Sequence, residues 1–585
     1  MSPRWLVATA ALASLAASPG ATQAATPSSR IVEDVGVAYL DWLKQDSLFL
    51  RMKLGLPIER LPDVSLAKDE NDAAQAKALL ARLGPVVPSD LSHEETLSLD
   101  ILSRQLGALT EAPRFHWLGF PVTPYASPIG GVNRAFSTFA FPDAEAADRY
   151  LSLARQLPSF YAGIRAKLEG QAARGIRIPR VELDLVVPFL RSQVGNADAS
   201  PYGVKPERLE ALPAERATAF REALRLLLEK EVNPPLEALA DWLDGAYRGT
   251  APESVGLGQY PGGPEFYGWL VKWHTTLDVT PEQVHSIGQE RVAAIEAEMA
   301  RLRDQLGFKG TKAEFRQLLK TDPRFFPKTP DEIGERLMSH IRRIEPRVDA
   351  FFLRKPKAPY GVKRLEPQLE PGWTFGYYNP PTAAEATGYY YYNGSRLQDR
   401  SLLNAAGLIF HELIPGHHFQ ISLANENEAI PAFRRESFDT AYTEGWGEYA
   451  SALCGEMGLY ADPYDRYGRL AMDMFVSTRL VVDTGMNALG WPRERAVAFM
   501  REHLMETDTQ IHTESLRYSC DIPGQALAYA MGAIRIRELR EKARAALGER
   551  FEIRRFHDAV LGHGSLPLTT LGRHVDWFIE QEKKR

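Results

Sequence analysis

The chain has 585 residues, of which 44% are hydrophobic and 25% charged, and its formal net charge is −6. These proportions are typical of a globular protein. The small net charge gives no sign of a nucleic acid or another polyanion as a partner. Beyond residue 30, no run reaches the roughly 18 apolar residues that a membrane helix needs, so we expect no stable membrane insertion.

Residues 1–24 have the pattern of a secretory signal peptide. Arg4 precedes an apolar run from Trp5 to Ala17, and small residues follow. The apolar run is short for a membrane anchor, and no cysteine stands at the cleavage region, which argues against a lipoprotein. The pattern predicts an exported protein, either periplasmic or secreted.

The rest of the chain is predicted to be mainly α-helical. Thr280 is a candidate helix cap, with Pro281 in the first turn and Gln283 at the capping-box position. We expect a single large helical domain over residues 31–585, with residues 31–360 forming a cleft and residues 361–585 carrying the functional site. Apolar residues recur at helical spacing in the stretches 72–83, 143–173, 205–246, 281–306 and 331–353.

Residues 371–396 differ from these helical stretches. Two tyrosine-rich runs flank a loop with proline and alanine, which predicts two short strands. The run Tyr389–Tyr392 is either an edge strand that pairs with an extended peptide or a buried aromatic strand. The two cysteines, Cys454 and Cys520, allow one disulfide, and neither lies in a CxxC pair that would bind zinc.

The stretch FHELIPGHHFQ, which begins at residue 410, contains a candidate metal site. His411 and the following glutamate begin like the H-E-x-x-H zinc motif, but Pro415 stands where the second histidine is expected. A helix turns about 100° per residue, so a regular helix cannot easily bring His417 or His418 to the same ion as His411. Proline and glycine disfavour a regular helix here. A bulge would favour His417 as the ligand and leave His418 facing a neighbour or the substrate.

A catalytic zinc also needs a third protein ligand and a position for water. Glu444 and Glu448 lie one helical turn apart, so Glu444 can be the third ligand. Glu448 can then accept a hydrogen bond from the far ring nitrogen of a ligand histidine. Glu412 is not needed as a ligand, and it suits the general base for a water whose pKa zinc lowers to about 7.

These spacings predict one zinc ion per chain, bound by His411, His417 and Glu444. The alternative is a buried polar cluster without metal. Other His–Glu combinations, His503 with Glu506 and His512 with Glu514, look like exposed helix charges.

Five stretches share the pattern of one group of proteins: His411–Gln420, Arg479–Gly485, Gly490–Trp491, Arg517–Tyr518 and Pro523–Tyr529. Together they resemble one bacterial family, the domain of unknown function 885, a group of predicted zinc peptidases. The resemblance covers nearly all of the mature chain and implies a large helical zinc-peptidase-like fold with a small β-sheet beside the zinc-binding helix. Glu444-x-x-x-Glu448 is also similar to the second motif of the gluzincins, in which an aspartate stands at the position of Glu448. Similar family members have a histidine where this chain has Asn487, so no role of that histidine is transferred.

Two further residues are candidates for the site. In similar helical zinc peptidases, a tyrosine from the C-terminal part donates to the developing oxyanion, and Tyr529 is the candidate here, with a core tyrosine as the alternative. Arg517 either binds the C-terminal carboxylate of a peptide or forms a structural salt bridge.

Together, the motif and the resemblance predict an exported zinc metallopeptidase that acts on short peptides, as an oligopeptidase or in a carboxypeptidase-like way. Two alternatives remain open: a zinc amidase or esterase for non-peptide substrates, and a catalytically inactive zinc-containing binding protein. Glu412 separates the last of these from the enzymes, because a structural zinc site needs no base and is usually closed by four protein ligands.

Overall fold

The computed structural model describes residues 26–585, apart from residues 124, 126, 368–369, 371–375 and 383–384. The predicted signal peptide therefore lies outside the described residues. The described chain is mainly α-helical with one small sheet, as predicted. None of its helices combines the length and the apolar character needed to cross a membrane.

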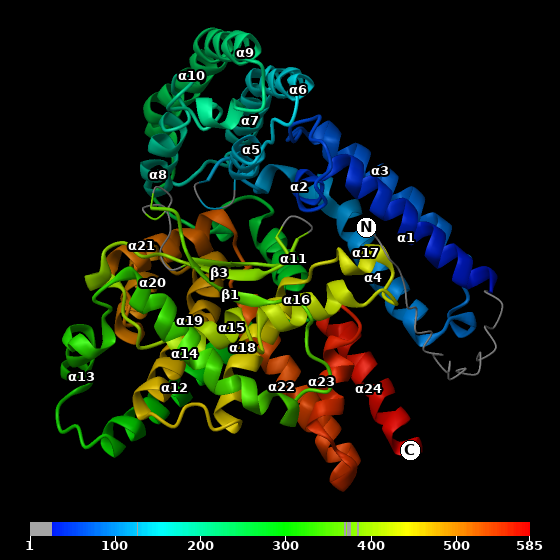
Figure 1. Cartoon of the computed structure of the whole chain (residues 1–585), viewed down its shortest axis with the longest axis vertical. Coiled ribbons are helices and arrows are strands. Elements are labelled where there is room, and N and C mark those ends of the chain that lie inside the picture. Colours follow the sequence, from blue (N-terminus) through cyan, green and yellow to red (C-terminus); the bar gives the residue numbers. More distant parts are fainter. Residues whose placement is uncertain (1–25, 124, 126, 368–369, 371–375, 383–384) are drawn as a thin grey trace, which may run out of the picture.

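The N-terminal helices form an elongated arm, and the next six form a separate lobe (Figure 1). The lobe has its own buried cluster, which runs from Val122 to Ala251. The arm consists of α1 (Pro27–Asp46), α2 (Leu48–Lys53), α3 (Leu66–Leu83) and α4 (His93–Phe115). The lobe consists of α5 (Pro128–Ser137), α6 (Ala144–Ala154), α7 (Leu157–Ala173), α8 (Arg180–Arg191), α9 (Ala214–Leu227) and α10 (Asn233–Trp242).

The remaining helices form the body of the molecule, below the lobe in Figure 1. Its first part contains α11 (Gly263–Thr275), α12 (Pro281–Gln305), α13 (Lys312–Thr321) and α14 (Pro330–Ile344). The site region contains α15 (Ala405–Glu412), α16 (His417–Glu426), α17 (Ala432–Arg435), α18 (Thr440–Glu456) and α19 (Pro463–Asn487). The C-terminal part contains α20 (Arg493–His503), α21 (Asp508–Leu516), the π-helix η12 (Arg517–Asp521), α22 (Leu527–Leu547), α23 (Ile553–Leu561) and α24 (Leu568–Lys584).

Local capping sets the start of helices that the sequence predicted. The Thr280 side chain accepts a hydrogen bond from the backbone N–H of Gln283, whose side chain accepts one from the backbone N–H of Thr280. This capping box satisfies two donors that a helix start leaves open. The predicted start of α12 is therefore confirmed.

The sheet has the strand order β1-β3-β2. The two predicted tyrosine strands exist as β2 (Gly376–Asn379) and β3 (Gly388–Tyr392), which pair antiparallel. An additional strand, β1 (Tyr360–Arg364), pairs parallel with β3. The edge-strand interpretation of Tyr389–Tyr392 is wrong, because β3 is paired on both sides and alternate side chains are buried.

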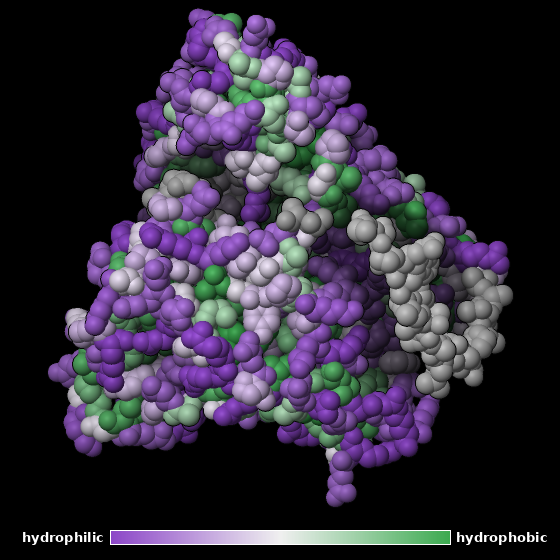
Figure 2. All heavy atoms as spheres, in the orientation of Figure 1, coloured by the Kyte–Doolittle hydropathy of each residue, from purple (hydrophilic) through white to green (hydrophobic). Residues whose placement is uncertain are grey.

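One buried cluster joins the arm to the body. It contains Leu97 and Ile101 of α4 together with Val575 and Phe578 of α24. The face drawn in Figure 2 is largely hydrophilic and is hollowed between the lobe and the body. The division into a cleft-forming part and a site-bearing part of one domain stays a prediction.

Candidate metal centre

The segment between α15 and α16 brings two histidines together. The helix that carries His411 ends at Glu412, and a second helix begins at His417. At the break, the backbone packs so closely that a Cβ on Gly416 would lie 1.8 Å from the carbonyl oxygen of His411. The indole N–H of Trp446 donates to the carbonyl oxygen of Pro415 at 2.9 Å. The bulge expected from Pro415 and Gly416 is thus a full break between two helices.

Three side chains meet beside this break. The Nε2 atoms of His411 and His417 are 3.0 Å apart, and Glu444 Oε2 lies 3.3 Å from each of them. A Cβ on Gly447 would lie 2.7 Å from the His411 ring, so only glycine lets α18 approach the imidazole this closely. Among the described residues, these three alone form a group of histidine, cysteine or carboxylate ligands with converging ligand atoms.

The separations among these ligand atoms fit a zinc ion. Two ligands at 2.0–2.1 Å from one tetrahedral ion lie about 3.3–3.4 Å apart. The observed separations of 3.0–3.3 Å are close to this value. Three protein ligands leave one tetrahedral position for water or substrate, as in catalytic zinc sites.

Glu448 lies behind His411, on the side away from His417. Its Oε1 is 3.1 Å from His411 Nδ1, and its Oε2 accepts a hydrogen bond from Arg469 at 2.8 Å. Although burial opposes ionisation, Arg469 and His411 lower the pKa of Glu448 to about 2. The ionised carboxylate can therefore hold His411 with Nδ1 protonated and Nε2 turned to the site.

The carboxylates also control the charge of His411. Burial lowers its pKa, but contacts with Glu444 and Glu448 outweigh burial and raise the pKa to about 10. The pKa of Glu444 is lowered, with burial opposed by both histidines. This negative charge attracts either a proton or a metal cation to the same nitrogen, so the two compete.

Glu412 has the environment of a base rather than of a ligand. Burial raises the pKa of its carboxyl above the usual range, and the neighbouring His417 and His411 only partly offset that rise. Its side chain lines a cavity that also reaches His411, Glu448 and Tyr529. A carboxyl with a raised pKa beside an accessible volume accepts a proton more readily than an ordinary carboxylate does.

His418 points away from the other two histidines. Its Nδ1 is hydrogen-bonded to the hydroxyl of Tyr378 at 2.9 Å, and its Nε2 to the carbonyl oxygen of Ala358 at 3.0 Å. Burial lowers its pKa to about 4, so it is neutral at pH 7. The structure therefore places the imidazole of His418, in α16, against Tyr378 of β2 and the segment before β1 rather than at the candidate metal site.

Tyr529 and Arg517 lie on the C-terminal side of the site. The Tyr529 ring is 6.4 Å from the His411 ring, and the Arg479 guanidinium lies 4.7 Å from the centre of the Tyr529 ring. Arg517 is buried, donates to Gln525 Oε1 at 2.7 Å and lies 3.4 Å from Glu514 Oε1. Its guanidinium already has protein partners, as the salt-bridge alternative expected.

Some residues near the site did not stand out in the sequence. Glu514 is 6% exposed and contacts Arg479 and Arg517, so its interpretation as an exposed charge is wrong. His503 is hydrogen-bonded to Glu296, and its side chain is only 13% exposed. For this group of residues, the sequence signal is Arg479 at the start of the apolar run RLVVDTG, which is typical of a buried, paired cation.

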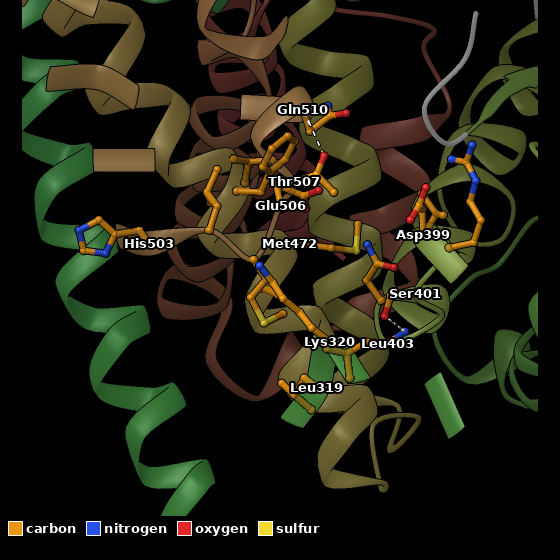
Figure 3. Close-up of a pocket in the computed structure, with 18 of the residues that line it drawn as sticks. Leu319, Lys320, Asp399, Ser401, Leu403, Met472, His503, Glu506, Thr507 and Gln510 are labelled. Atoms are coloured by element: carbon orange, nitrogen blue, oxygen red, sulfur yellow. Dashed lines mark hydrogen bonds between the residues drawn. The ribbon is translucent and has the colours of Figure 1, made fainter. Parts of the chain in front are cut away.

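The cavity beside Glu412 has a volume of about 720 Å³. Side chains from several elements point into it, among them Leu319, Met472 and Glu506 (Figure 3). Its volume is within the range of about 300–1,000 Å³ that is usual for small-molecule sites. The candidate metal centre therefore adjoins a space large enough for a small molecule.

Fold and site together define a mainly helical protein with a candidate His-His-Glu metal centre beside a cavity. The chain belongs to the family of bacterial proteins of unknown function DUF885, whose model matches residues 50–575. The comparison with curated proteins gives no match.

Two solved structures share this fold. One is a predicted lipoprotein from Colwellia psychrerythraea, with 24% sequence identity, a TM-score of 0.88, and coverage of 95% of this chain and 100% of that chain. The other is a predicted lipoprotein of unknown function from Shewanella oneidensis, with 18% identity, a TM-score of 0.71, and coverage of 93% and 99%. At these identities the similarity establishes the fold alone.

Proposed function

We propose that this protein is an exported zinc-dependent metallopeptidase that hydrolyses short peptides. The observation that carries the proposal is the convergence of His411 Nε2, His417 Nε2 and Glu444 Oε2 within 3.0–3.3 Å of one another. When bound there, zinc would supply Lewis acidity that lowers the pKa of a water molecule to about 7.

The side chains around this point divide the remaining tasks. Glu412 accepts the proton of the attacking water and passes it to the leaving amine. Glu448 keeps His411 in one tautomer and orientation through the Nδ1 contact of 3.1 Å. Tyr529, whose ring faces that of His411, is the candidate to donate to the developing oxyanion.

A free base next to three ligands favours an enzyme over a structural zinc site. An amidase or esterase would use the same groups, and the choice of peptides rests on the adjoining cavity and on the resemblance to zinc peptidases. The signal-peptide pattern and the likeness to two predicted lipoproteins support export.

The test combines metal analysis with a substrate screen. Purified wild type should carry about one zinc per chain, and His411→Ala should lose it. Incubation with a mixed peptide library should give cuts, detected by mass spectrometry, that a chelator abolishes and added zinc restores. Zinc-free wild type after careful metal loading would refute the metal site, whereas chelator-sensitive cleavage of non-peptide amides alone would favour the amidase.

A further inference from the structure

The cavity beside the metal centre has two unpaired acidic side chains in its wall. Glu412 is one, and Glu506, on the loop between α20 and α21, is the other. Glu506 forms no hydrogen bond or ion pair with any described residue. The other two acidic side chains of the wall are paired: Glu448 contacts Arg469 at 2.8 Å, and Asp399 contacts Arg396 at 3.8 Å.

Cations in the wall do not neutralise Glu506 by direct contact. Arg479 pairs with Glu514 and Tyr518, and His503 pairs with Glu296. Lys320 also lines the cavity, but it is exposed and has no ion pair with a described residue. Figure 3 shows Glu506 beside Thr507 and Gln510, apart from Lys320.

The environment of Glu506 is unfavourable for an isolated carboxylate. Burial and the neighbouring Glu514 raise the pKa of Glu506 to about 7, against the opposing effect of Lys320 and Arg479. A buried charge without a partner costs free energy, and a cation brought by a ligand would remove that cost.

The path between Glu506 and the metal centre suits a long side chain. Much of the wall is apolar and includes Leu403, Leu408, Met472 and Phe475. Lysine and arginine side chains can lay their alkyl part against apolar surface and place the charged end at a carboxylate. Glu506 is also electrostatically coupled to Arg479, which lies over the ring of Tyr529.

We propose that Glu506 is a specificity-determining residue, which receives a cationic group of the substrate in the cavity beside the metal centre. The inference rests on the proposed peptidase function and narrows its substrates to peptides with an ammonium or guanidinium group. The cation can be a lysine or arginine side chain or the free N-terminus of the peptide.

The test compares matched peptides that contain lysine or norleucine at one scanned position, each with a free or an acetylated N-terminus. For wild-type holoprotein we expect kcat/KM to be roughly tenfold to a hundredfold higher for the cationic member of a pair, as for a hydrogen bond between charged groups. A preference for lysine identifies a side chain as the source, and a preference lost on acetylation identifies the N-terminus.

Variants then assign the preference to one carboxylate. Glu506→Gln should bring the ratio of kcat/KM for the cationic peptide to kcat/KM for its neutral partner close to one. Glu494→Gln removes an exposed carboxylate of α20 outside the cavity and should preserve this ratio. Lys320→Ala removes a competing cation and should raise the ratio. Zinc content and thermal unfolding show whether each variant is folded and loaded. Equal ratios in wild type and Glu506→Gln, or no charge preference in wild type, would overturn the inference.

A binding arm separates this inference from the proposed function. Calorimetry with the same peptides is made on zinc-loaded Glu412→Gln, with and without Glu506→Gln, so that no turnover is needed. Charge-dependent binding that requires Glu506, without cleavage of any peptide by wild type, would refute the peptidase and support the cation site. Cleavage of peptides without charge-dependent binding would support the peptidase and refute the cation site.

Discussion

Two histidine clusters in this molecule look alike in composition but differ in geometry. In the candidate metal site, which we name the metal cluster, the ligand atoms of His411, His417 and Glu444 lie within 3.3 Å of one another. In the second, which we name the arm cluster, His93 of α4 meets His574 of α24, and His563 lies against Glu94. His574 donates from Nε2 to the carbonyl oxygen of Ala559, and its Nδ1 is 2.7 Å from His93 Nε2.

Charge separates the two clusters further. Carboxylates raise the pKa of His411 to about 10, whereas burial and the neighbouring His563 and His93 lower the pKa of His574 to about 3. The arm cluster satisfies its imidazoles by pairwise contacts, and burial lowers the pKa of both His93 and His574. The contrast teaches that convergence of ligand atoms and nearby negative charge, not the number of histidines, indicate a cation site.

The largest expected effect is the loss of a ligand. His417→Gln should lose stoichiometric zinc and all activity, because only two protein ligands remain. The matched variant His418→Gln changes the neighbouring histidine, which contacts Tyr378 and Ala358, and should retain zinc. Elemental analysis of both proteins after dialysis decides the point; retention of zinc by the first and its loss by the second would exchange the two roles.

Next in size is the loss of the base. Glu412→Gln should retain zinc but reduce kcat by about 10²–10⁴, because the amide can hydrogen-bond water but cannot accept its proton. The same peptide assay and metal analysis measure both quantities. A wild-type rate in this variant would show that Glu412 is not the base.

A smaller effect is expected from the carboxylate behind His411. Glu448→Gln should weaken zinc affinity by about 10–100-fold, the usual cost of losing such a supporting group. Affinity should also fall as the pH is lowered, because His411, with a pKa raised to about 10 by Glu444 and Glu448, must release its proton to bind metal. Competition with a chromophoric chelator at several pH values measures the effect of the substitution and the effect of pH on zinc affinity. An affinity that Glu448→Gln leaves unchanged would show that Glu448 does not support metal binding.

The smallest effect belongs to the arm cluster. His93→Ala should lower the free energy of unfolding by about 1 kcal/mol, the net value of one hydrogen bond, and leave zinc content unchanged. Wild type should also lose stability as the pH falls from about 6.5 towards 3, because the unfolded chain then protonates His574 while the folded chain does not. Urea unfolding of wild type and His574→Phe over this range measures how the free energy of unfolding changes with pH, and the change should be smaller in the variant. Loss of zinc from His93→Ala or His574→Phe would contradict the view that the arm cluster binds no metal.

Local sequence signals predicted much of the helical fold and brought the metal residues into one hypothesis. The cap at Thr280, the two tyrosine strands and the break at Pro415 follow from neighbours a few residues apart. Spacing alone also placed Glu448 one turn from Glu444. These features depend on backbone chemistry that is local to each segment.

Features set by distant segments could not be predicted in this way. The strand β1 has only five residues, and its pairing with β3 spans residues far apart in the chain. Glu514 resembles an exposed charge until Arg479, 35 residues earlier, packs against it. Tyr125, from the segment between arm and lobe, lies over Arg517 at 4.6 Å, a contact without a local pattern.

The buried cluster shared by α4 and α24 has a consequence for the order in which the molecule is assembled. The helix α4, which packs on α1 and α3 early in the chain, finds a further set of apolar partners only in α24, the last helix of the described chain. Contacts between such remote segments require closure of a very long loop and slow the folding of a chain. The α4 helix therefore lacks these partners until α24 has been made, and a truncation before Leu568 would expose the apolar surface of α4 that α24 covers.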